Sequence, residues 1–533
     1  MNWVPITAET HGYVLVRGGR SLLIDCPCHD MGARLRAAGV PRPEAILHTQ
    51  VQEEHCREWG DLADVPVYVA ADAADIARRS NAFFQECRTQ WPLDRAWDPV
   101  NRGMDKYGIG GRMTERPPAR ALNVAGILQP GETFRWRDVE LEIVPLPGSG
   151  KRPIGIFDRA DRTLFAGDLL HAGGYVVNLY DLERGYGIPR GYEEAIESLS
   201  RLIALRPRRV LPSTGPEIRS PLGDARRLVA ALQRFQTPRV YSPNRKPCRE
   251  VTPRPRLGLF QKHAEGLWQN WNCGCVILLI DPQGRACCFD PDICVWLSWE
   301  ENCRQMHEQL DLFEREAGLK RIETAFITHP HGDHMEYAPL LRERYGTEIV
   351  ATADVAEVLE HPLDYPYVCL LDWFNFPFSS FTVDRRLPYE QAYRWRDVEV
   401  RPFHSPGHCF AHATYLLEWQ GLKLACSGDA LQHDGGPVST LFRVIYSDAG
   451  SGARGYLPTY DRLLAEKPDL VLGAHSQWFD ARDGSVLRDL RQATVDWEEQ
   501  ARALVAGGDL DAATTPPGFD QARARLLERA GRA

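Results

Sequence analysis

The chain has 533 residues, of which 44% are hydrophobic and 25% charged, and its formal net charge is −9. This length exceeds what one hydrophobic core normally fills, and the composition excludes a disordered or fibrous protein. No apolar run reaches the roughly 18 residues that a membrane helix needs, and no charged-then-apolar leader follows Met1. We therefore expect a soluble cytoplasmic protein that does not enter a membrane.

The fourteen cysteines are irregularly spaced, which argues against a disulfide framework. The pairs Cys26/Cys28 and Cys273/Cys275 do not align between the two halves of the chain, which also argues against a shared zinc site. Most of the cysteines are expected to be small buried hydrophobic residues in a reducing compartment.

In the amino-terminal half, the first predicted elements are strands that end in a carboxylate. The apolar run Leu22–Ile24 ends in Asp25, and Phe165-Ala166-Gly167 ends in Asp168. Between them lies the hexapeptide Arg135-Trp136-Arg137-Asp138-Val139-Glu140. An amphipathic helix is predicted to begin at an Asp224 cap.

A proline-rich segment then interrupts the pattern. Five prolines alternate with arginines between Arg234 and Arg256, a composition that fits neither a helix nor the interior of a sheet. The segment predicts an extended linker that joins one domain, residues 1–245, to a second, residues 256–533.

The second half contains the most informative stretch, His329-Pro330-His331-Gly332-Asp333-His334. It follows the apolar run Thr324–Thr328, which is typical of a buried strand. Three imidazoles and a carboxylate suit metal ions far better than a core, and the turn at Gly332 divides them between two neighbouring positions.

The further ligands that such a site needs follow three later predicted strands. Each strand ends in a turn of small residues, and the candidates are His408 after Val398–Phe403, Asp429 after Leu422–Cys426, and His475 after Leu470–Leu472. An amphipathic helix is predicted after Ser485.

The two halves are copies of one domain. The hexapeptide recurs as Arg394–Glu399, Asp25 is matched by Asp290, and forty-six residues after Asp168 and Asp429 come Thr214 and His475. In the first copy, the ligand positions carry mostly poor metal ligands: Gln50, Gln52, Glu54, His55, Ser149, Asp168 and Thr214. This half is predicted to be a structural partner, and the alternative is a remodelled pocket for part of the substrate or for an effector.

With this order of motifs, the second half resembles the metallo-β-lactamase superfamily, whose members are αββα sandwich hydrolases. The resemblance implies an α/β protein with two tandem αββα sandwich domains, the first of them degenerate. It assigns one metal to His329, His331 and His408, a second to Asp333, His334 and His475, and makes Asp429 the bridge between them. The implied cofactors are two divalent metal ions, for which zinc is expected, although iron(II) and manganese(II) accept the same ligands.

Within the superfamily, the ligand set is most similar to those of glyoxalase II, the lactonases and RNase Z. Zinc β-lactamases of the common type place Cys where this chain has Asp429, and flavodiiron oxygen reductases place Glu where it has His331. His412 resembles the second histidine of the glyoxalase-type string, one residue closer than in a strict match, and is predicted to lie behind the ligands. Further candidates for proton transfer are Asp333 and His433.

An aromatic-rich segment lies between the first motif and His408, and it predicts either a local core or an apolar wall over the metals. Its aromatic residues are Tyr365, Tyr367, Trp373, Phe374, Phe376, Phe378 and Phe381. On the second interpretation, Trp373 and Phe374 are candidate substrate-binding residues. Tyr446, which like His433 follows Asp429 and could donate to a leaving group, is a further candidate for contact with the substrate.

The sequence therefore predicts a dinuclear metal-dependent hydrolase of a small-molecule ester, lactone or thioester. One alternative is a nucleic-acid phosphodiesterase, since long RNase Z has a similar two-domain architecture; the net negative charge argues against that substrate. A second alternative is an iron-binding, oxygen-handling or noncatalytic metal protein. The two domains are expected to form an internal pseudo-dimer, with homo-oligomers as a further alternative.

Overall fold

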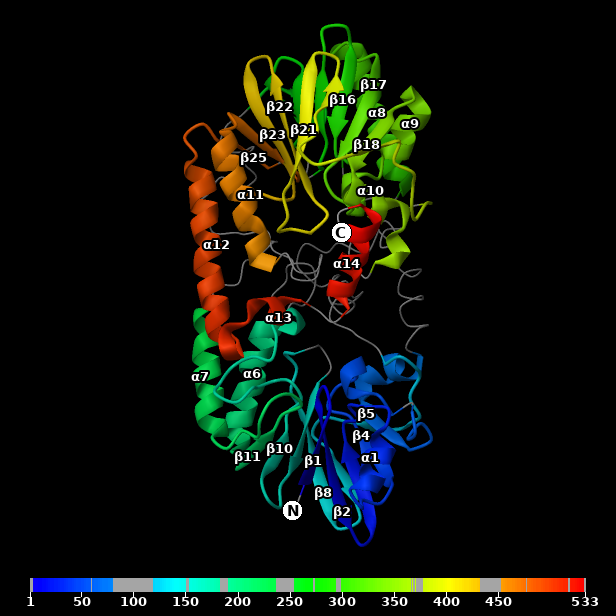
Figure 1. The fold of residues 1–533 in the computed structure, drawn as a ribbon, viewed down its shortest axis with the longest axis vertical. Coiled ribbons are helices and arrows are strands. Elements are labelled where there is room, and N and C mark those ends of the chain that lie inside the picture. The colour runs from blue at the N-terminus through cyan, green and yellow to red at the C-terminus, as the bar shows by residue number, and fades with distance from the viewer. Residues whose placement is uncertain are drawn as a thin grey trace. The chain divides into compact units, whose positions relative to one another are not determined.

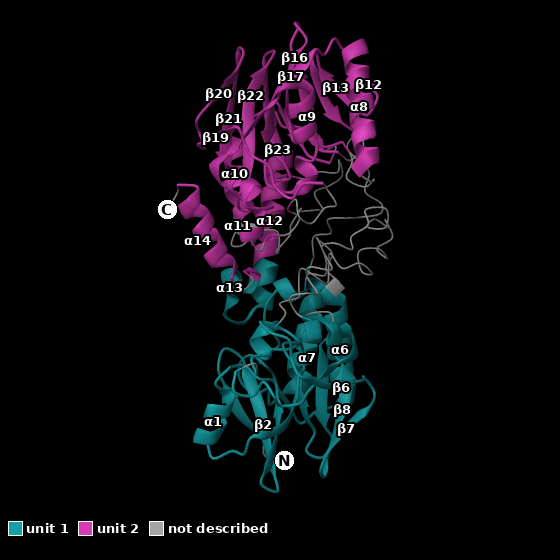
Figure 2. Ribbon diagram, turned by 90° about the vertical axis from the view of Figure 1, so that its right-hand side faces the viewer, with its two compact units in different colours: residues 1–90, 108–237, 499–513 teal, residues 91–107, 238–498, 514–533 magenta. Residues whose placement is uncertain are grey.

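The computed structural model of the chain describes residues 3–58, 60–79, 118–149, 153–182, 190–235, 254–271, 274–293, 299–365, 367, 370, 377–431, 452–475, 477–515 and 518–531. They form two compact units (Figure 2). The amino-terminal unit comprises residues 1–90, 108–237 and 499–513, and the carboxyl-terminal unit comprises residues 91–107, 238–498 and 514–533. Most of the predicted linker, residues 236–253, lies outside the described residues.

The amino-terminal unit has two sheets. The six-stranded sheet runs in the order β1 (Trp3–Thr7), β2 (His11–Arg17), β3 (Arg20–Ile24), β4 (Pro43–Leu47), β5 (Val67–Ala70) and β6 (Val124–Leu128). The five-stranded sheet runs in the order β11 (Arg209–Leu211), β10 (Thr163–Phe165), β9 (Ile154–Asp158), β8 (Val139–Pro145) and β7 (Thr133–Trp136). Helix α1 (Met31–Ala37) lies on one side of this pair, and α6 (Arg190–Leu205) and α7 (Pro221–Arg234) lie on the other (Figure 1).

The carboxyl-terminal unit repeats this arrangement with larger sheets. Its eight-stranded sheet contains β12 (Arg256–Leu257), β13 (Phe260–Ala264), β14 (Leu267–Asn270), β15 (Ile277–Ile280), β16 (Arg285–Phe289), β17 (Arg321–Ile327), β18 (Glu348–Thr352) and β19 (Arg385–Leu387). Its six-stranded sheet contains β20 (Tyr393–Trp395), β21 (Val398–His404), β22 (Ala413–Trp419), β23 (Leu422–Gly428), β24 (Leu470–Gly473) and β25 (Trp478–Asp480).

Helices cover both outer faces of this second pair of sheets. Figure 1 shows α8 (Trp299–Glu316), α9 (Ala338–Tyr345) and α10 (Ala353–Glu360) on one side, and α11 (Gly452–Glu466) and α12 (Ser485–Leu504) on the other. The layers are therefore helix, sheet, sheet and helix, as the resemblance implied. Among the helices that the structure describes, none is long and apolar enough to cross a membrane.

The last elements of the chain divide between the units. Residues 499–513, which begin with the last part of α12, pack with the amino-terminal unit, where the Val176 and Leu179 N–H groups donate to the carbonyls of Leu504 and Ala513 at 2.9 and 2.8 Å. This stretch includes most of α13 (Leu510–Thr514), whereas α14 (Phe519–Arg529) belongs to the carboxyl-terminal unit and contacts α10.

The central strands are apolar because both of their faces are buried. Along β15, Ile277 and Leu279 face the core between the sheets, while Leu278 and Ile280 face the core under the helices. Successive side chains of a strand point to opposite faces, so a strand between two cores needs a continuous apolar run. The run Thr324–Thr328 has the same cause.

The structure repeats the same polar contacts in both units. Asp25 accepts hydrogen bonds from the Thr49 N–H and hydroxyl at 2.8 and 2.7 Å, and Asp290 accepts the same pair from Thr328 at 2.8 and 2.7 Å. In each recurring hexapeptide the tryptophan donates to a glutamate, Trp136 to Glu44 and Trp395 to Glu323. These matching contacts support the internal duplication.

The predicted start of helix α7 at Asp224 is wrong. The helix begins at Pro221, with Ser220 as its cap residue. Proline suits the first helical turn because it lacks the N–H that would be unsatisfied there. Asp224 instead lies inside the helix and accepts a hydrogen bond from the Gly173 N–H at 2.8 Å.

Candidate metal centre

The candidate metal ligands lie just beyond the ends of neighbouring strands. His329 follows β17, His408 follows β21, Asp429 follows β23, and His475 follows β24. Strands β16, β17 and β18 are parallel to one another, as are β23 and β24, so the turns at their carboxyl ends gather on one edge of each sheet. The four segments thereby converge although they are far apart in sequence.

Three of the histidines form one group. The ring centroids of His329, His331 and His408 lie 4.5 to 5.0 Å apart, and His408 Nε2 is 3.0 Å from His331 Nδ1. All three side chains are buried. Buried imidazoles this close together disfavour protonation of one another, and neutral imidazole is the form that binds a metal cation.

A second group forms around His334 and His475. His475 Nε2 lies 3.6 Å from the Asp333 carboxylate and 3.4 Å from that of Asp429, and His334 Nε2 lies 3.7 Å from Asp429. His408 of the first group is also 3.4 Å from the same Asp429 oxygen. Asp429 therefore lies between the two groups.

The residues present fit a metal pair. Among the described residues, the buried Nε2 of His329 and Oδ1 of Asp429 have no hydrogen-bond partner. Leaving buried polar atoms unpaired costs about 1–3 kcal/mol each, and a bound cation would satisfy both. His475 also has a left-handed backbone, with φ of 54°, a strained conformation that is concentrated at functional sites.

Other polar side chains orient the ligands. Asp290 Oδ2 lies 3.0 Å from His334 Nδ1, and the Thr328 hydroxyl, which donates to Asp290, lies 3.0 Å from His329 Nδ1. Hydrogen bonds of this kind fix the ring orientation and tautomer of a ligating histidine. The repeated pairs Asp25–Thr49 and Asp290–Thr328 could have identified these two residues from the sequence.

Burial and neighbouring charges set the protonation states of the ligands. Burial, together with the other imidazoles, lowers the pKa of His329 well below its ordinary value, and burial and His334 lower that of His331 to about 3. Burial alone would lower the pKa of His334, but Cys275, Asp290 and Asp429 raise it well above its ordinary value. These lowered pKa values, together with that of His408, which burial lowers well below its ordinary value, favour neutral imidazoles in the first group, the form in which histidine binds a metal.

His412 lies against the first group of ligands. Its buried ring stacks on His329 with centroids 4.8 Å apart, and its Nδ1 is 2.8 Å from the Ser405 hydroxyl. Thr414 in turn donates to Ser405 at 2.8 Å. These contacts hold the His412 ring against His329.

The remaining predicted site residues divide between the core and the undescribed parts of the chain. Tyr365 and Tyr367 stack on each other and are buried, and Phe378 packs against Trp299. These described aromatics belong to a core. Four of the predicted substrate-binding or proton-transfer residues lie outside the described residues: Trp373, Phe374, His433 and Tyr446.

The corresponding positions of the amino-terminal unit bind one another. Asp168 accepts hydrogen bonds from Gln50 at 2.5 Å and Thr214 at 2.9 Å, and it forms an ion pair with His55 at 2.9 Å. Both oxygens of the carboxylate that corresponds to Asp429 are thus engaged by protein groups. We expect such a closed network in a half that holds no metal pair.

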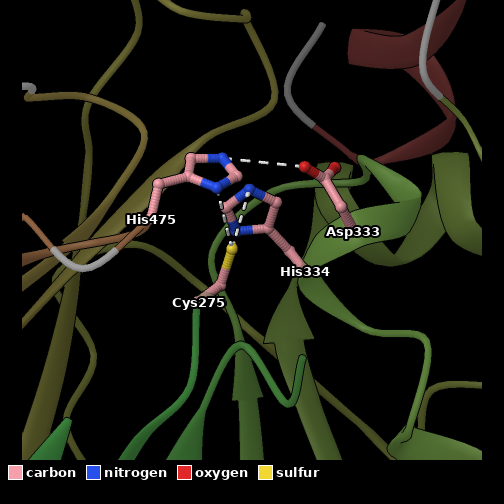
Figure 3. A group of neighbouring side chains, drawn as sticks. All are labelled: Cys275, Asp333, His334 and His475. Carbon is pink, nitrogen blue, oxygen red and sulfur yellow. Dashed lines mark hydrogen bonds and ion pairs between the residues drawn. The ribbon is translucent and has the colours of Figure 1, made fainter. Parts of the chain in front are cut away.

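Sequence reasoning missed Cys275. Its sulfur lies 3.8 Å from His334 Nε2 and 3.8 Å from His475 Nδ1 (Figure 3). Cys275 precedes β15, and the pair Cys273/Cys275, which has no aligned counterpart in the first half, is only a weak sequence signal for a metal ligand.

Replacing Gly407 with alanine is expected to displace His408. Gly407 has a φ of +139°, and a Cβ there would lie 2.6 Å from the buried ring of Tyr456. The strain and the clash should each cost roughly 1–3 kcal/mol, and metal should be lost from the first group. Thermal unfolding and the metal-to-protein ratio measure the two effects.

The matched control for this prediction is Gly421→Ala. Gly421 also has a positive φ, +81°, but a Cβ there meets nothing within 4 Å. This variant should lose about 1–2 kcal/mol of stability through strain and keep its full metal content. Equal metal loss in both variants would contradict the clash with Tyr456.

Comparison with known proteins finds one family model that matches both halves. A sequence model of the metallo-beta-lactamase superfamily matches residues 9–214 and 297–475. Acyl-coenzyme A thioesterase MBLAC2 of Gallus gallus is 31% identical over 176 residues, which cover 30% of this chain and 58% of the thioesterase. The chain thus spans little more than half the length of that curated relative.

Solved structures with similarity to the chain include two with β-lactamase names. The β-lactamase from Chitinophaga pinensis is 15% identical, with 46% of this chain and 94% of that chain covered and a TM-score of 0.35. A metallo-β-lactamase family protein from Thermus thermophilus is 20% identical, with 44% and 79% covered and a TM-score of 0.32.

Proposed function

The chain belongs to the metallo-β-lactamase superfamily, and from this membership we propose that its carboxyl-terminal half is a metal-dependent hydrolase with two adjacent divalent ions. One ion would be held by His329, His331 and His408. The other would be held by Asp333, His334 and His475. Zinc is the proposed metal, because imidazole and carboxylate ligands suit it well.

The observation that carries this proposal is the position of Asp429. One of its oxygens lies 3.4 Å from both His408 Nε2 and His475 Nε2, nitrogens that belong to the two different groups. For ligand bonds of about 2.0–2.2 Å, two ligand atoms of one tetrahedral metal lie roughly 3.4 Å apart. Asp429 would therefore be placed to contribute to both metal positions.

When bound, the two ions would lower the pKa of a water molecule toward neutrality and polarise the substrate carbonyl. The protein residues hold these ions and keep their ligands in place. Asp290 and Thr328 fix the rings of His334 and His329, while His412 and Ser405 support His329 from behind. Asp333 is the predicted proton carrier, and its side chain is 18% exposed, so it can exchange protons with solvent.

As the substrate we propose a small-molecule ester or thioester. The name of the thioesterase relative supports a thioester in particular. The phosphodiesterase and iron-protein alternatives use the same ligand set. Imidazoles and carboxylates also bind iron and manganese, so the ligands alone do not exclude an iron protein. No structural observation favours either alternative over hydrolysis of an acyl bond.

A substrate and metal panel tests this proposal. Purified protein is analysed for bound metals and assayed with nitrophenyl acetate, a series of lactones, acyl-coenzyme A thioesters and bis-nitrophenyl phosphate. We expect about two zinc ions per chain and turnover of the acyl substrates. Turnover of the phosphodiester alone would favour the nucleic-acid alternative, and iron with no hydrolysis would favour the oxygen-handling one.

A further inference from the structure

Cys275 occupies a rigid position at the edge of the candidate metal centre. Its N–H donates to the Asp292 carbonyl at 2.9 Å, and the preceding Gly274 N–H donates to the Asn270 side chain at 3.1 Å. Gly274 lies so close to Ile293 that a Cβ on it would be 2.4 Å from the Ile293 carbonyl oxygen. The Cys275 side chain is 1% exposed, so its direction is set by the fold.

The sulfur of Cys275 points at two predicted ligands of the second metal. It lies 3.8 Å from nitrogens of both His334 and His475 (Figure 3). One ligand atom from each of Cys275, Asp333, His334 and His475 can be chosen so that all four lie within 4.8 Å of one another. With zinc–nitrogen bonds of about 2.0 Å and zinc–sulfur bonds of about 2.3 Å, nitrogen and sulfur ligands of a tetrahedral ion lie roughly 3.5 Å apart.

The same backbone position faces the corresponding loop in the amino-terminal unit. In the carboxyl-terminal unit, Ile277 pairs with Phe289, the residue before Asp290, and in the amino-terminal unit Tyr13 pairs with Ile24, the residue before Asp25. Ile277 and Tyr13 therefore correspond, and so do the residues two positions earlier, Cys275 and His11. His11 Nε2 forms a 2.8 Å hydrogen bond with the carbonyl of Gly215, which directly follows Thr214, the counterpart of His475. In both units, therefore, this position contacts the loop that carries the last ligand position.

The other cysteine near the ligands is engaged differently. Cys409 falls in a group with His329 and His331, but its thiol donates to the Ala411 carbonyl at 3.5 Å. That bond keeps the proton on the Cys409 sulfur, whereas the groups within reach of the Cys275 sulfur are imidazole nitrogens. The two cysteines therefore have different expected roles.

We propose that Cys275 is an additional ligand of the second metal, beside Asp333, His334 and His475. This inference rests on the proposed function and specifies which ion the second position selects. Binding displaces the thiol proton to solvent and leaves a thiolate on the metal. Because thiolate is a soft ligand, the second position should prefer zinc or cobalt(II) over manganese(II) and magnesium more strongly than the first position, which has no sulfur ligand.

The test is cobalt(II) substitution of the full-length protein, followed by absorption spectroscopy. A thiolate bound to cobalt gives a near-ultraviolet charge-transfer band that imidazole and carboxylate ligands do not give. We expect this band in the wild type once the second position is filled and its loss in Cys275→Ser and Cys275→Ala. In both variants the affinity for the second cobalt ion should fall by about tenfold or more. Even the loss of a residue that only orients a metal ligand costs about tenfold in metal affinity.

Two further variants are controls. Cys303→Ser alters a partly exposed cysteine on α8, away from the ligands, and should keep the band and both affinities. Cys409→Ser should also keep the band. Thermal unfolding of every metal-free variant shows whether it folds, and Cys275→Ser, which keeps nearly the same side-chain volume, guards against a packing defect in Cys275→Ala.

Three results would overturn the proposal. In the first, the band survives in folded Cys275→Ser and disappears in Cys409→Ser. In the second, the wild type binds two cobalt ions without the band, which refutes the thiolate ligand but leaves the proposed hydrolase intact. In the third, the wild type binds no cobalt or zinc at all, which removes the proposed function as well.

Discussion

Replacing Asp429 with alanine is expected to remove the second metal and to abolish hydrolysis. Asp429 is the carboxylate within 3.4–3.7 Å of His408, His334 and His475, and its Oδ1 has no hydrogen-bond partner among the described residues. Metal ions contribute several kcal/mol of transition-state stabilisation, so kcat/KM should fall by about 10³-fold or more. Elemental analysis and the assay on the best acyl substrate measure the two losses.

The internal repeat provides the matched control. Asp168→Ala makes the same change at the corresponding position of the amino-terminal unit, where the carboxylate is bound by Gln50, His55 and Thr214. We expect this variant to keep its metals and its kcat/KM when it is assayed under conditions where it remains folded. Equal loss of activity from both variants would mean that the amino-terminal unit takes part in the chemistry.

The strands and the turns that carry the candidate ligands could be predicted because their causes are local. A strand buried on both faces must be a continuous apolar run, which made Thr324–Thr328 and Leu470–Leu472 recognisable before the fold was known. A functional residue directly after such a run lies at the edge of the sheet. The duplicated hexapeptide then fixed the alignment of the two halves, and with it the corresponding positions of Asp168 and Asp429.

Other features could not be predicted because they depend on contacts between distant segments. Cys275 lies beside His334 and His475 because hydrogen bonds hold the loop before β15 in place. The Cys275 N–H donates to the Asp292 carbonyl, and the Asn270 side chain accepts from the Gly274 N–H and donates to the Ile293 carbonyl. The packing of residues 499–513 with the amino-terminal unit depends on backbone hydrogen bonds to Val176 and Leu179, and backbone groups carry no sequence signal. The misplaced start of α7 has a similar cause, since Asp224 bonds to Gly173 instead of capping the helix.

The two units share the same supporting contacts but differ at the ligand positions. Both retain the aspartate that fixes a threonine at the end of the next strand, Asp25 with Thr49 and Asp290 with Thr328. The framework contacts are therefore kept even where the ligands are lost. At the ligand positions, His55 and Asp168 neutralise each other directly, whereas in the carboxyl-terminal unit Asp429 lies between two groups of histidines and, among the described residues, its Oδ1 has no hydrogen-bond partner.

This difference predicts that the ion pair between His55 and Asp168 acts on stability and not on chemistry. Both side chains are at least 95% buried. Removing one member of a buried pair leaves an uncompensated charge, which typically costs about 3–5 kcal/mol. Asp168→Ala should therefore lower the free energy of unfolding of the amino-terminal unit by that amount. Hydrogen exchange of peptides from each unit, followed in increasing urea, measures the stability of the two units separately. A larger loss of stability in the carboxyl-terminal unit than in the amino-terminal unit would contradict the prediction.

The same pair predicts how stability depends on pH. Burial alone would lower the pKa of His55, but the Asp168 carboxylate raises it to about 9, above the value near 6.5 of an unfolded histidine. The stability that comes from this shift is fully present below about pH 6.5 and is lost as the pH rises through about 9. At about 1.4 kcal/mol per pKa unit, the loss is roughly 3 kcal/mol. Urea unfolding at about pH 6.5 and about pH 9 should show this loss of stability in the wild type. Asp168→Asn should not show the loss, because it lacks the charge that holds the proton on His55. An alkaline loss of the same size in that variant would place its origin elsewhere in the unit.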